Sequence, residues 1–373
     1  MTKKVLTGLL ARELGLLDSA LAAFEKNENT RACDQAAHLA IQVEGRKHQA
    51  RAFATLEAML KEERSQAEAI AVSCELGRAR LASNQPEVAA KFLRGVFGKA
   101  NELSKLSGDS SLTIYPSYCQ ALVYLALKKY TLALALANSV VAAIDLLPVA
   151  EQEERKWLLV GALLCSGRAA ASENLWRSAA RSFTRLSDFL PDLCSRHGLS
   201  YPGSACQIGI LKTAAVALLE LADWPRAAVF AEEWVASVEA KEGREAPALI
   251  EPLCYLASAY EHWQRSKGVK CLHRALDIVA SAVADEPFTG NAGAGVAEAL
   301  KMPEKEYQLL MRMADSYLLQ GKLADSLKLY PAAMRARYTN YVSSAVNLTE
   351  SLFQGIGKVR KYYADRKAAD DIE

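Results

Sequence analysis

The chain has 373 residues, of which 51% are apolar and 24% are charged, which allows two or three ordinary domains or one extended repeat array. The 45 Lys and Arg residues against 43 Asp and Glu residues give a formal charge of +2, which excludes a global attraction to nucleic acid or to an anionic membrane. Its 20 Gly and 11 Pro residues exclude a collagen-like chain, and its aliphatic content excludes a charged disordered chain. We therefore expect a globular protein.

The N-terminal segment, residues 1–24, begins with basic residues, as a targeting peptide would. Lys3, Lys4 and Arg12 supply the positive charge, but Glu13 and Asp18 interrupt it, and no small-residue cleavage site follows. We expect this segment to be the first helix of the fold.

The most apolar stretch runs over residues 132–147. It contains Asn138, Ser139 and Asp145, it ends at Pro148, and it is too short to span a bilayer. We interpret it as a buried helix, and we expect no membrane insertion.

Eight cysteines are spread widely through apolar segments, which is typical of reduced, buried thiols and favours a cytoplasmic location; an organelle matrix or a cilium stays open. They are Cys33, Cys74, Cys119, Cys165, Cys194, Cys206, Cys254 and Cys271. Only Cys194, His197 and Cys206 have a metal-like spacing. Because no fourth ligand lies nearby, we interpret residues 194–205 as a structural loop and expect no metal.

One short pattern recurs along the chain: a small residue, a bulky residue three positions later, then, after a turn, a second small residue and a bulky residue four positions beyond it. Six positions agree in the middle of the chain: Gly167, Ala170, Trp176, Ala179, Phe183 and Pro191. Small residues let two antiparallel helices approach closely, Phe183 fills the space between them, and Pro191 ends the second helix. Other copies begin, in chain order, at Gly8, Ala37, Gly77, Ala121, Ala215, Ala257 and Ala314.

This pattern resembles the tetratricopeptide repeat, whose consensus places Gly or Ala, Tyr, Ala, Phe and Pro at these offsets. The resemblance implies an all-α, right-handed α-solenoid of about seven or eight helical hairpins over residues 1–335. The second small residue of successive copies falls at Ala20, Ala50, Ala89, Ala133, Ala179, Ala227, Val269 and Ser326. Most of these steps exceed the standard unit of about 34 residues, so the chain is similar to long-helix variants of the family. We expect residues 336–373 to form a C-terminal capping helix and a polar tail, and we expect no sheet.

The expected loops contain no motif that indicates catalysis or cofactor binding. Spacers are expected at residues 108–111, 194–205 and 285–295. Gly290, Gly293 and Gly295 precede a helix as in a phosphate-binding loop, but no strand leads into them and no Lys-Ser/Thr follows. Because no catalytic grouping is present, we expect a protein that is not an enzyme and that takes no cofactor and no small-molecule substrate.

The concave face of such a solenoid is lined by the first helix of each hairpin, and function is expected there. In the family register these groove positions fall on or near Arg78, Tyr115, Tyr118, Arg168, Lys212, Arg312 and Asp315. Several are cationic, so an acidic segment or a C-terminal carboxylate is the complementary ligand, while ordinary solvated charges are the alternative. Arg168 stands where the chaperone-binding branch has a clamp Asn, which argues against a receptor for chaperone tails.

The favoured hypothesis is a non-enzymatic scaffold or adaptor subunit that binds other proteins of a larger assembly through its groove and loops. The alternative is a receptor for one short acidic or C-terminal peptide, as in a cargo adaptor. A helical-repeat RNA-binding protein is a third possibility, against which the neutral charge and the unit length argue.

Overall fold

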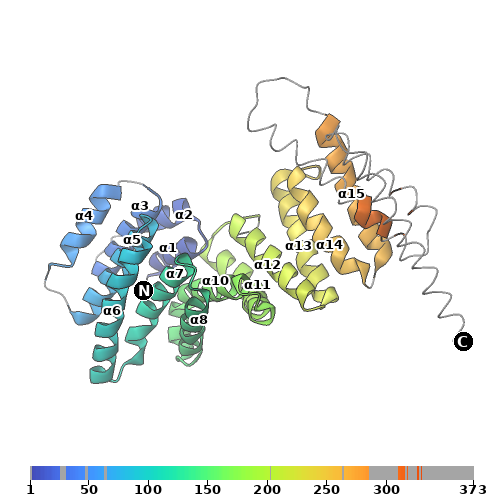
Figure 1. Cartoon of the computed structure of the whole chain (residues 1–373). Coiled ribbons are helices and arrows are strands. Elements are labelled where there is room, and N and C mark those ends of the chain that lie inside the picture. The colour runs from blue at the N-terminus through green and yellow to red at the C-terminus, as the bar shows by residue number, and fades with distance from the viewer. Residues whose placement is uncertain are drawn as a thin grey trace, which may run out of the picture. The chain divides into compact units, whose positions relative to one another are not determined.

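The computed structural model describes residues 2–25, 31–46, 49–62, 65–201, 203–262 and 264–284, together with 310–315, 317, 326 and 329. These residues form helices and turns, with no strand among them (Figure 1). Two compact units, Met1–Ala217 and Leu218–Glu373, divide the chain. The all-α prediction is confirmed. The predicted capping helix, the division at residue 335 and the spacer at 285–295 lie outside the described residues.

The first unit consists of helical hairpins in sequence. Its helices are α1 (Lys3–Glu13), α2 (Leu17–Glu25), α3 (Ala32–Glu44), α4 (Gln49–Met59), α5 (Gln66–Ala82), α6 (Pro86–Ser107), η1 (Ser110–Thr113), α7 (Ile114–Ala126), α8 (Tyr130–Asp145), α9 (Val149–Glu154), α10 (Lys156–Ser172) and α11 (Trp176–His197). The two helices of each hairpin pack together in α1/α2, α3/α4, α5/α6, α7/α8 and α10/α11. The short helix α9 lies between the fourth and fifth hairpins.

The second unit begins within α12 (Ala205–Glu220). It continues with α13 (Trp224–Glu242), η2 (Pro247–Leu249), α14 (Ile250–Glu261) and α15 (Arg265–Ala284). Pro225 lies in the first turn of α13, where its missing N–H group leaves no helical hydrogen bond unmade. Helix α14 packs against both α13 and α15. Over the described part of the chain, the helices thus follow one another in pairs, as the repeat pattern predicts.

One turn geometry joins the helices of most pairs. A single residue with positive φ closes the turn at Gly15, Arg46, Asn84, Lys128, Asn174 and Ala222. At the turns other than Arg46, the next residue donates its N–H group to the carbonyl five positions earlier, as from Leu175 to Ala170 at 2.8 Å, which is the Schellman arrangement at a helix end. The separation between successive turns increases at every step along the chain. The turns therefore follow the lengthening repeat read from the sequence.

Close contact between the helices of a hairpin depends on glycine. In three hairpins a glycine of the first helix faces a bulky side chain of the second: Gly8 and Phe24, Gly77 and Leu93, and Gly167 and Phe183. A Cβ atom at Gly167 would lie only 2.6 Å from Phe183 Cε2, so no larger residue fits without displacing the ring. This contact agrees with the predicted close approach of the two helices at Gly167.

The core of the first unit contains clusters that each join two successive hairpins. One cluster contains Cys74 from α5, Leu93 from α6, and Cys119 and Val123 from α7. Successive hairpins thus share core residues, as expected for a repeat array.

The end of α11 differs from the prediction that Pro191 ends it. Pro191 lies inside the helix, which continues to His197 and ends at Gly198 with φ of 65°. The pyrrolidine ring is on the exposed side, so the helix loses one main-chain hydrogen bond without forcing a ring into the core. The left-handed Gly198 provides the actual stop.

The first helices of the five hairpins in the first unit close into a ring. Each packs against the next, in the order α1, α3, α5, α7 and α10, and α10 packs back against α1. A repeat usually touches only its neighbours, so the contact between the first and fifth hairpins is an added feature. It brings the inner faces of five helices toward one another.

Candidate functional site

Charged and phenolic side chains gather where the first helices of the ring meet. We call them the inner network: Arg12 and Glu13 of α1, Glu44 of α3, Glu75 and Arg78 of α5, and Tyr115 and Tyr118 of α7. The residues come from four hairpins that lie far apart in the sequence. Short-range patterns in the sequence therefore give no sign of their association.

Arg12 is the central cation of the inner network, and its side chain is fully buried. Its Nη1 donates to Glu75 Oε2 at 2.6 Å, and its Nη2 and Nε donate to Glu44 Oε1 at 2.5 and 2.9 Å. Burial and the neighbouring Arg78 disfavour the charge on Arg12, but Glu44 and Glu75 outweigh them and raise its pKa. Burial alone would raise the pKa of Glu44, whereas Arg12 and Arg78 lower it below its ordinary value. Both groups are therefore ionised at neutral pH.

Arg78 is the second cation. Its Nη1 donates to Glu13 Oε1 at 2.5 Å, and the guanidinium lies 5.7 Å from the centre of the Tyr118 ring, within cation–π range. The Tyr118 hydroxyl donates to the other oxygen of Glu13. A Cβ atom at Gly161 of α10 would collide with that hydroxyl and lie 2.7 Å from Glu13 Oε2, so the absent side chain makes room for this pair.

Tyr115 completes the set, because its hydroxyl donates to Glu75 Oε1 at 2.5 Å. Burial, followed by nearby negative groups, raises the pKa of Tyr115 and of Tyr118, so both phenols stay protonated and serve as donors. Three carboxylates face two guanidinium groups, and the two phenols supply hydrogen bonds to the excess acid. Such an arrangement holds helices in register and offers no nucleophile.

Comparison with known proteins finds similarity to solved structures but not to any protein-family model or curated sequence. Similar solved structures include BtubC from P. vanneervenii at 14% identity, covering 69% of this chain and 93% of that one, with a TM-score of 0.41. RapI is 12% identical over 88% of this chain and 97% of its own, with a TM-score of 0.47. A STAND-family signal transduction ATPase with a tetratricopeptide repeat sensor, from Pyrococcus horikoshii, is 13% identical over 92% of this chain and 46% of its own, with a TM-score of 0.48.

Within the chain itself, the repeated left-handed turn and the glycine contact across each of three hairpins carry the repeat register. The chain has a tetratricopeptide-like fold. It is an α-solenoid of the kind that the sequence pattern predicts.

In this tetratricopeptide-like fold, the inner network changes the interpretation of three predicted groove residues. Arg78 and Tyr118 are 7% and 1% exposed and lie inside the ring, and half-buried Tyr115 is bound to Glu75. The prediction that these side chains line an open groove is wrong for Arg78 and Tyr118. The physical reason is the packing of α10 against α1, which turns the groove side of the first helices into a core.

The remaining groove positions have different surroundings. Arg168 on α10 is exposed and Lys212 on α12 is half-buried. In the second unit, half-buried Arg312 donates to the carbonyl of Cys254 at 3.0 Å and to the Ser258 hydroxyl, and Asp315 is also half-buried. As ligand contacts, these four residues stay a prediction.

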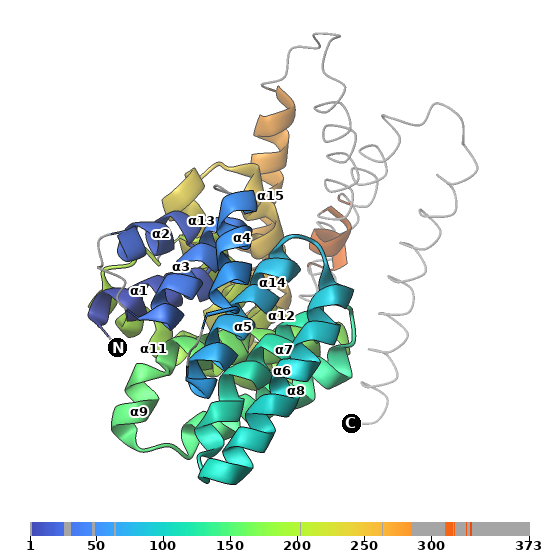
Figure 2. The same cartoon turned by 90° about the vertical axis from the view of Figure 1, so that its left-hand side faces the viewer.

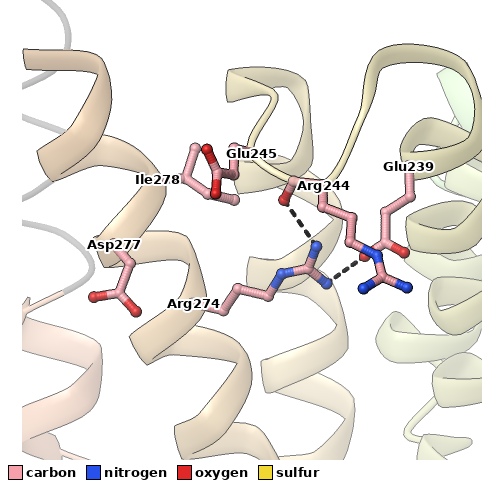
Figure 3. A pocket seen from close by; sticks show the side chains of 6 residues that line it. All are labelled: Glu239, Arg244, Glu245, Arg274, Asp277 and Ile278. Carbon is pink, nitrogen blue, oxygen red and sulfur yellow. Dashed lines mark hydrogen bonds and ion pairs between the residues drawn. The ribbon is translucent and has the colours of Figure 1, made fainter. Parts of the chain in front are cut away.

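A pocket of about 520 Å³ lies in the second unit and is lined by Glu239, Arg244, Glu245, Arg274, Asp277 and Ile278 (Figure 3). Arg274 already forms an ion pair with Glu239 and donates to the carbonyl of Arg244 at 2.9 Å. Its cation is thus occupied by the protein itself. The other charged residues of the lining are Arg244, Glu245 and Asp277.

The metal-like residues of the sequence belong to the end of α11 and the start of α12. Burial raises the pKa of Cys194 to about 12, and the pKa of Cys206 to about 11. His197 Nδ1 is hydrogen-bonded to the Thr7 hydroxyl at 2.8 Å, which connects the end of α11 to α1. Cys194 and Cys206 are therefore protonated thiols at neutral pH.

Helix α8 differs from the prediction of a buried helix. It buries Ala133, Ala137, Val140 and Ile144, but Leu132 is 51% and Leu146 is 87% exposed. Its exposed side combines Leu132, Ala135, Ala142 and Leu146 with the polar Thr131, Asn138, Ser139 and Asp145. Across the residues that the structure describes, no helix combines the length and apolar character needed to cross a bilayer.

Proposed function

We propose that the chain is a non-enzymatic interaction scaffold that holds partner proteins of a larger assembly through its outer helices and loops. The inner network carries this proposal. Three of the predicted groove residues in the first unit, Arg78, Tyr115 and Tyr118, are bound by the protein's own carboxylates, so we expect partners to contact the outer surface of the helices. The eight cysteines, none joined in a disulfide, are compatible with a reducing compartment such as the cytoplasm.

The second candidate is a receptor for a short acidic or C-terminal peptide. Exposed Arg168, on a first helix outside the inner network, supports it, because a free guanidinium binds carboxylates in a bidentate manner. The two candidates place the partner on different surfaces and can be separated by mutation.

Affinity purification of the full chain, followed by cross-linking mass spectrometry, tests the scaffold. We expect a reproducible set of proteins cross-linked to the outer helices, and we expect the double variant Arg168→Glu/Lys212→Glu to retain that set. Loss of all partners in this variant would favour the peptide receptor instead. Retention of RNA that declines steeply with salt would contradict both candidates.

A further inference from the structure

The outer face of α8 exposes the polar Thr131, Asn138 and Asp145 along one edge and a stripe of apolar and small residues beside them. Beyond Leu132 and Leu146 this stripe exposes Ala135, Ser139 and Ala142, with Leu136 and Ala143 half-buried beside them. At 3.6 residues per turn these seven positions fall within one side of the helix. Helix α8 lies at the lower edge of the first unit in Figure 2.

The side chains of this stripe match in type at four of the six positions around Ser139, whereas Leu136 corresponds to Ala142. Leu132 and Leu146 each lie seven residues away from Ser139, Ala135 and Ala143 four, and Leu136 and Ala142 three. Two copies of this helix can pack antiparallel with Ser139 opposite Ser139. Leu132 of each copy then meets Leu146 of the other. The small residues near the centre permit close approach of the two helices.

The charges at the two ends of α8 have opposite sign. Exposed Lys128 and Lys129 precede the helix, whereas Asp145 ends it and exposed Glu151 follows in α9. Asp145 is already paired with Arg185, which leaves Glu151 as the acidic group at that end. Antiparallel packing of two copies brings the basic end of each to the acidic end of the other, whereas parallel packing opposes like charges. The helix dipoles favour the same orientation.

We propose that a second copy of this chain packs on the outer face of α8, antiparallel and with Ser139 at the two-fold axis. The contact is isologous, because the same patch serves both protomers. It gives the proposed scaffold two equivalent sets of binding surfaces. Failure of this contact leaves the scaffold proposal intact, because its test concerns other proteins.

The size of the patch sets the strength of the dimer. A helix of 16 residues is about 24 Å long at 1.5 Å per residue. One helix pair buries less than the roughly 1,200 Å² at which specific, stable interfaces begin. The dimer is therefore reversible, with a dissociation constant on the order of micromolar or weaker.

Sedimentation velocity of the purified full chain, over a concentration series reaching several hundred micromolar, measures this association. We expect the wild type to change from monomer to dimer, and Leu146→Glu to raise the dissociation constant at least tenfold, because it places a charge in the contact. Leu106→Glu is the matched control, because Leu106 is 85% exposed just before the C-terminal end of α6, compared with 87% for Leu146. A wild type that stays monomeric, or equal effects of the two variants, overturns the proposal.

Cysteine cross-linking tests the orientation independently of stability. At the two-fold axis, Ser139→Cys places two thiols within disulfide reach, which requires Cα atoms within about 7 Å. Ala135→Cys on the same face meets Ala143 of the other copy, so it forms no disulfide with itself. A covalent dimer from Ser139→Cys alone supports the antiparallel contact. Dimers from both variants, as parallel packing gives, or from neither, overturn it.

The charge arrangement gives a third measurement. We expect Lys128→Glu and Glu151→Lys each to weaken the dimer several-fold, and the double variant to recover toward the wild-type dissociation constant. Absence of any recovery contradicts the pairing of opposite ends.

Discussion

Replacing Arg12 by methionine tests whether the inner network holds the first unit closed. Methionine fills a similar length without the charge, so Glu44 and Glu75 both lose the guanidinium that binds them. Arg12 is fully buried and the Glu75 side chain is 5% exposed, so water cannot replace the lost partner. Breaking a buried ion pair costs about 3–5 kcal/mol. Arg78 Nε remains 3.6 Å from Glu44 Oε1, so we expect the lower end, about 3 kcal/mol.

An exposed ion pair of similar geometry is the control. Arg185 binds Asp145 through two hydrogen bonds of 2.6 and 3.0 Å, but its side chain is 38% exposed. We expect Arg185→Met to cost about 0–1 kcal/mol. Urea denaturation followed by circular dichroism gives the free energy of unfolding for both variants.

Hydrogen exchange locates the effect of Arg12→Met. A loss of about 3 kcal/mol raises exchange in α1, α3 and α10 on the order of 100-fold, while α14 in the second unit keeps its protection. The defect becomes smaller at acidic pH, because protonation removes the charge of the unpaired carboxylates. Equal losses of stability in Arg12→Met and Arg185→Met, or a defect independent of pH, would refute the reasoning.

Three further measurements follow from the structure. The lowered pKa of Glu44 contributes stability that is present above pH 4.5 and is lost as the pH falls through the pKa of the folded state. Acid titration should therefore reduce amide protection in α3 before it does so in α13. Protection of α3 that is constant down to pH 3 contradicts this. Gly167→Ala should destabilise the first unit by about 1–3 kcal/mol through its contact with Phe183, whereas Gly95→Ala, with open space around its Cβ, should stabilise α6 by about 0.5–1 kcal/mol; thermal unfolding that shows the same sign for both argues against the close contact. Ala222→Gly should stabilise the turn after α12 by about 1 kcal/mol, because Ala222 has φ of 56°, and an unchanged or lower melting temperature would exclude a left-handed residue there.

The repeat register could be predicted from the sequence because it is local. Gly167 and Phe183 belong to one hairpin, so the same offset recurs wherever such a hairpin forms. The turns were visible only in part: Gly15 and Asn174 are residue types that adopt positive φ readily, whereas Lys128 and Ala222 give no such signal.

The inner network was not predictable in the same way. Arg12 and Arg78 each look like an ordinary charge on a helix, whose usual place is the solvent. Carboxylates of α3 and α5 bind Arg12 and a carboxylate of α1 binds Arg78, and no local pattern specifies these long-range contacts. The tetratricopeptide resemblance correctly placed Arg78 and Tyr118 on the inner face of the first helices. It implied that this face is an open groove, whereas both side chains are buried. For α8, composition indicated burial without showing that the protein covers only one side.

The ring of first helices has a consequence for how the chain folds during synthesis. Repeat arrays commonly fold hairpin by hairpin, because their contacts are local and their contact order is low. Here the hydrogen bond between Glu13 and Tyr118 can form only after the fourth hairpin is synthesised, and the contact between α1 and α10 only after the fifth. When the first four hairpins have left the ribosome, Arg12 and the three carboxylates are present, but α10 is not yet there to pack against α1. We therefore expect the first unit to fold cooperatively, so that removal of a terminal hairpin lowers the stability of the other hairpins.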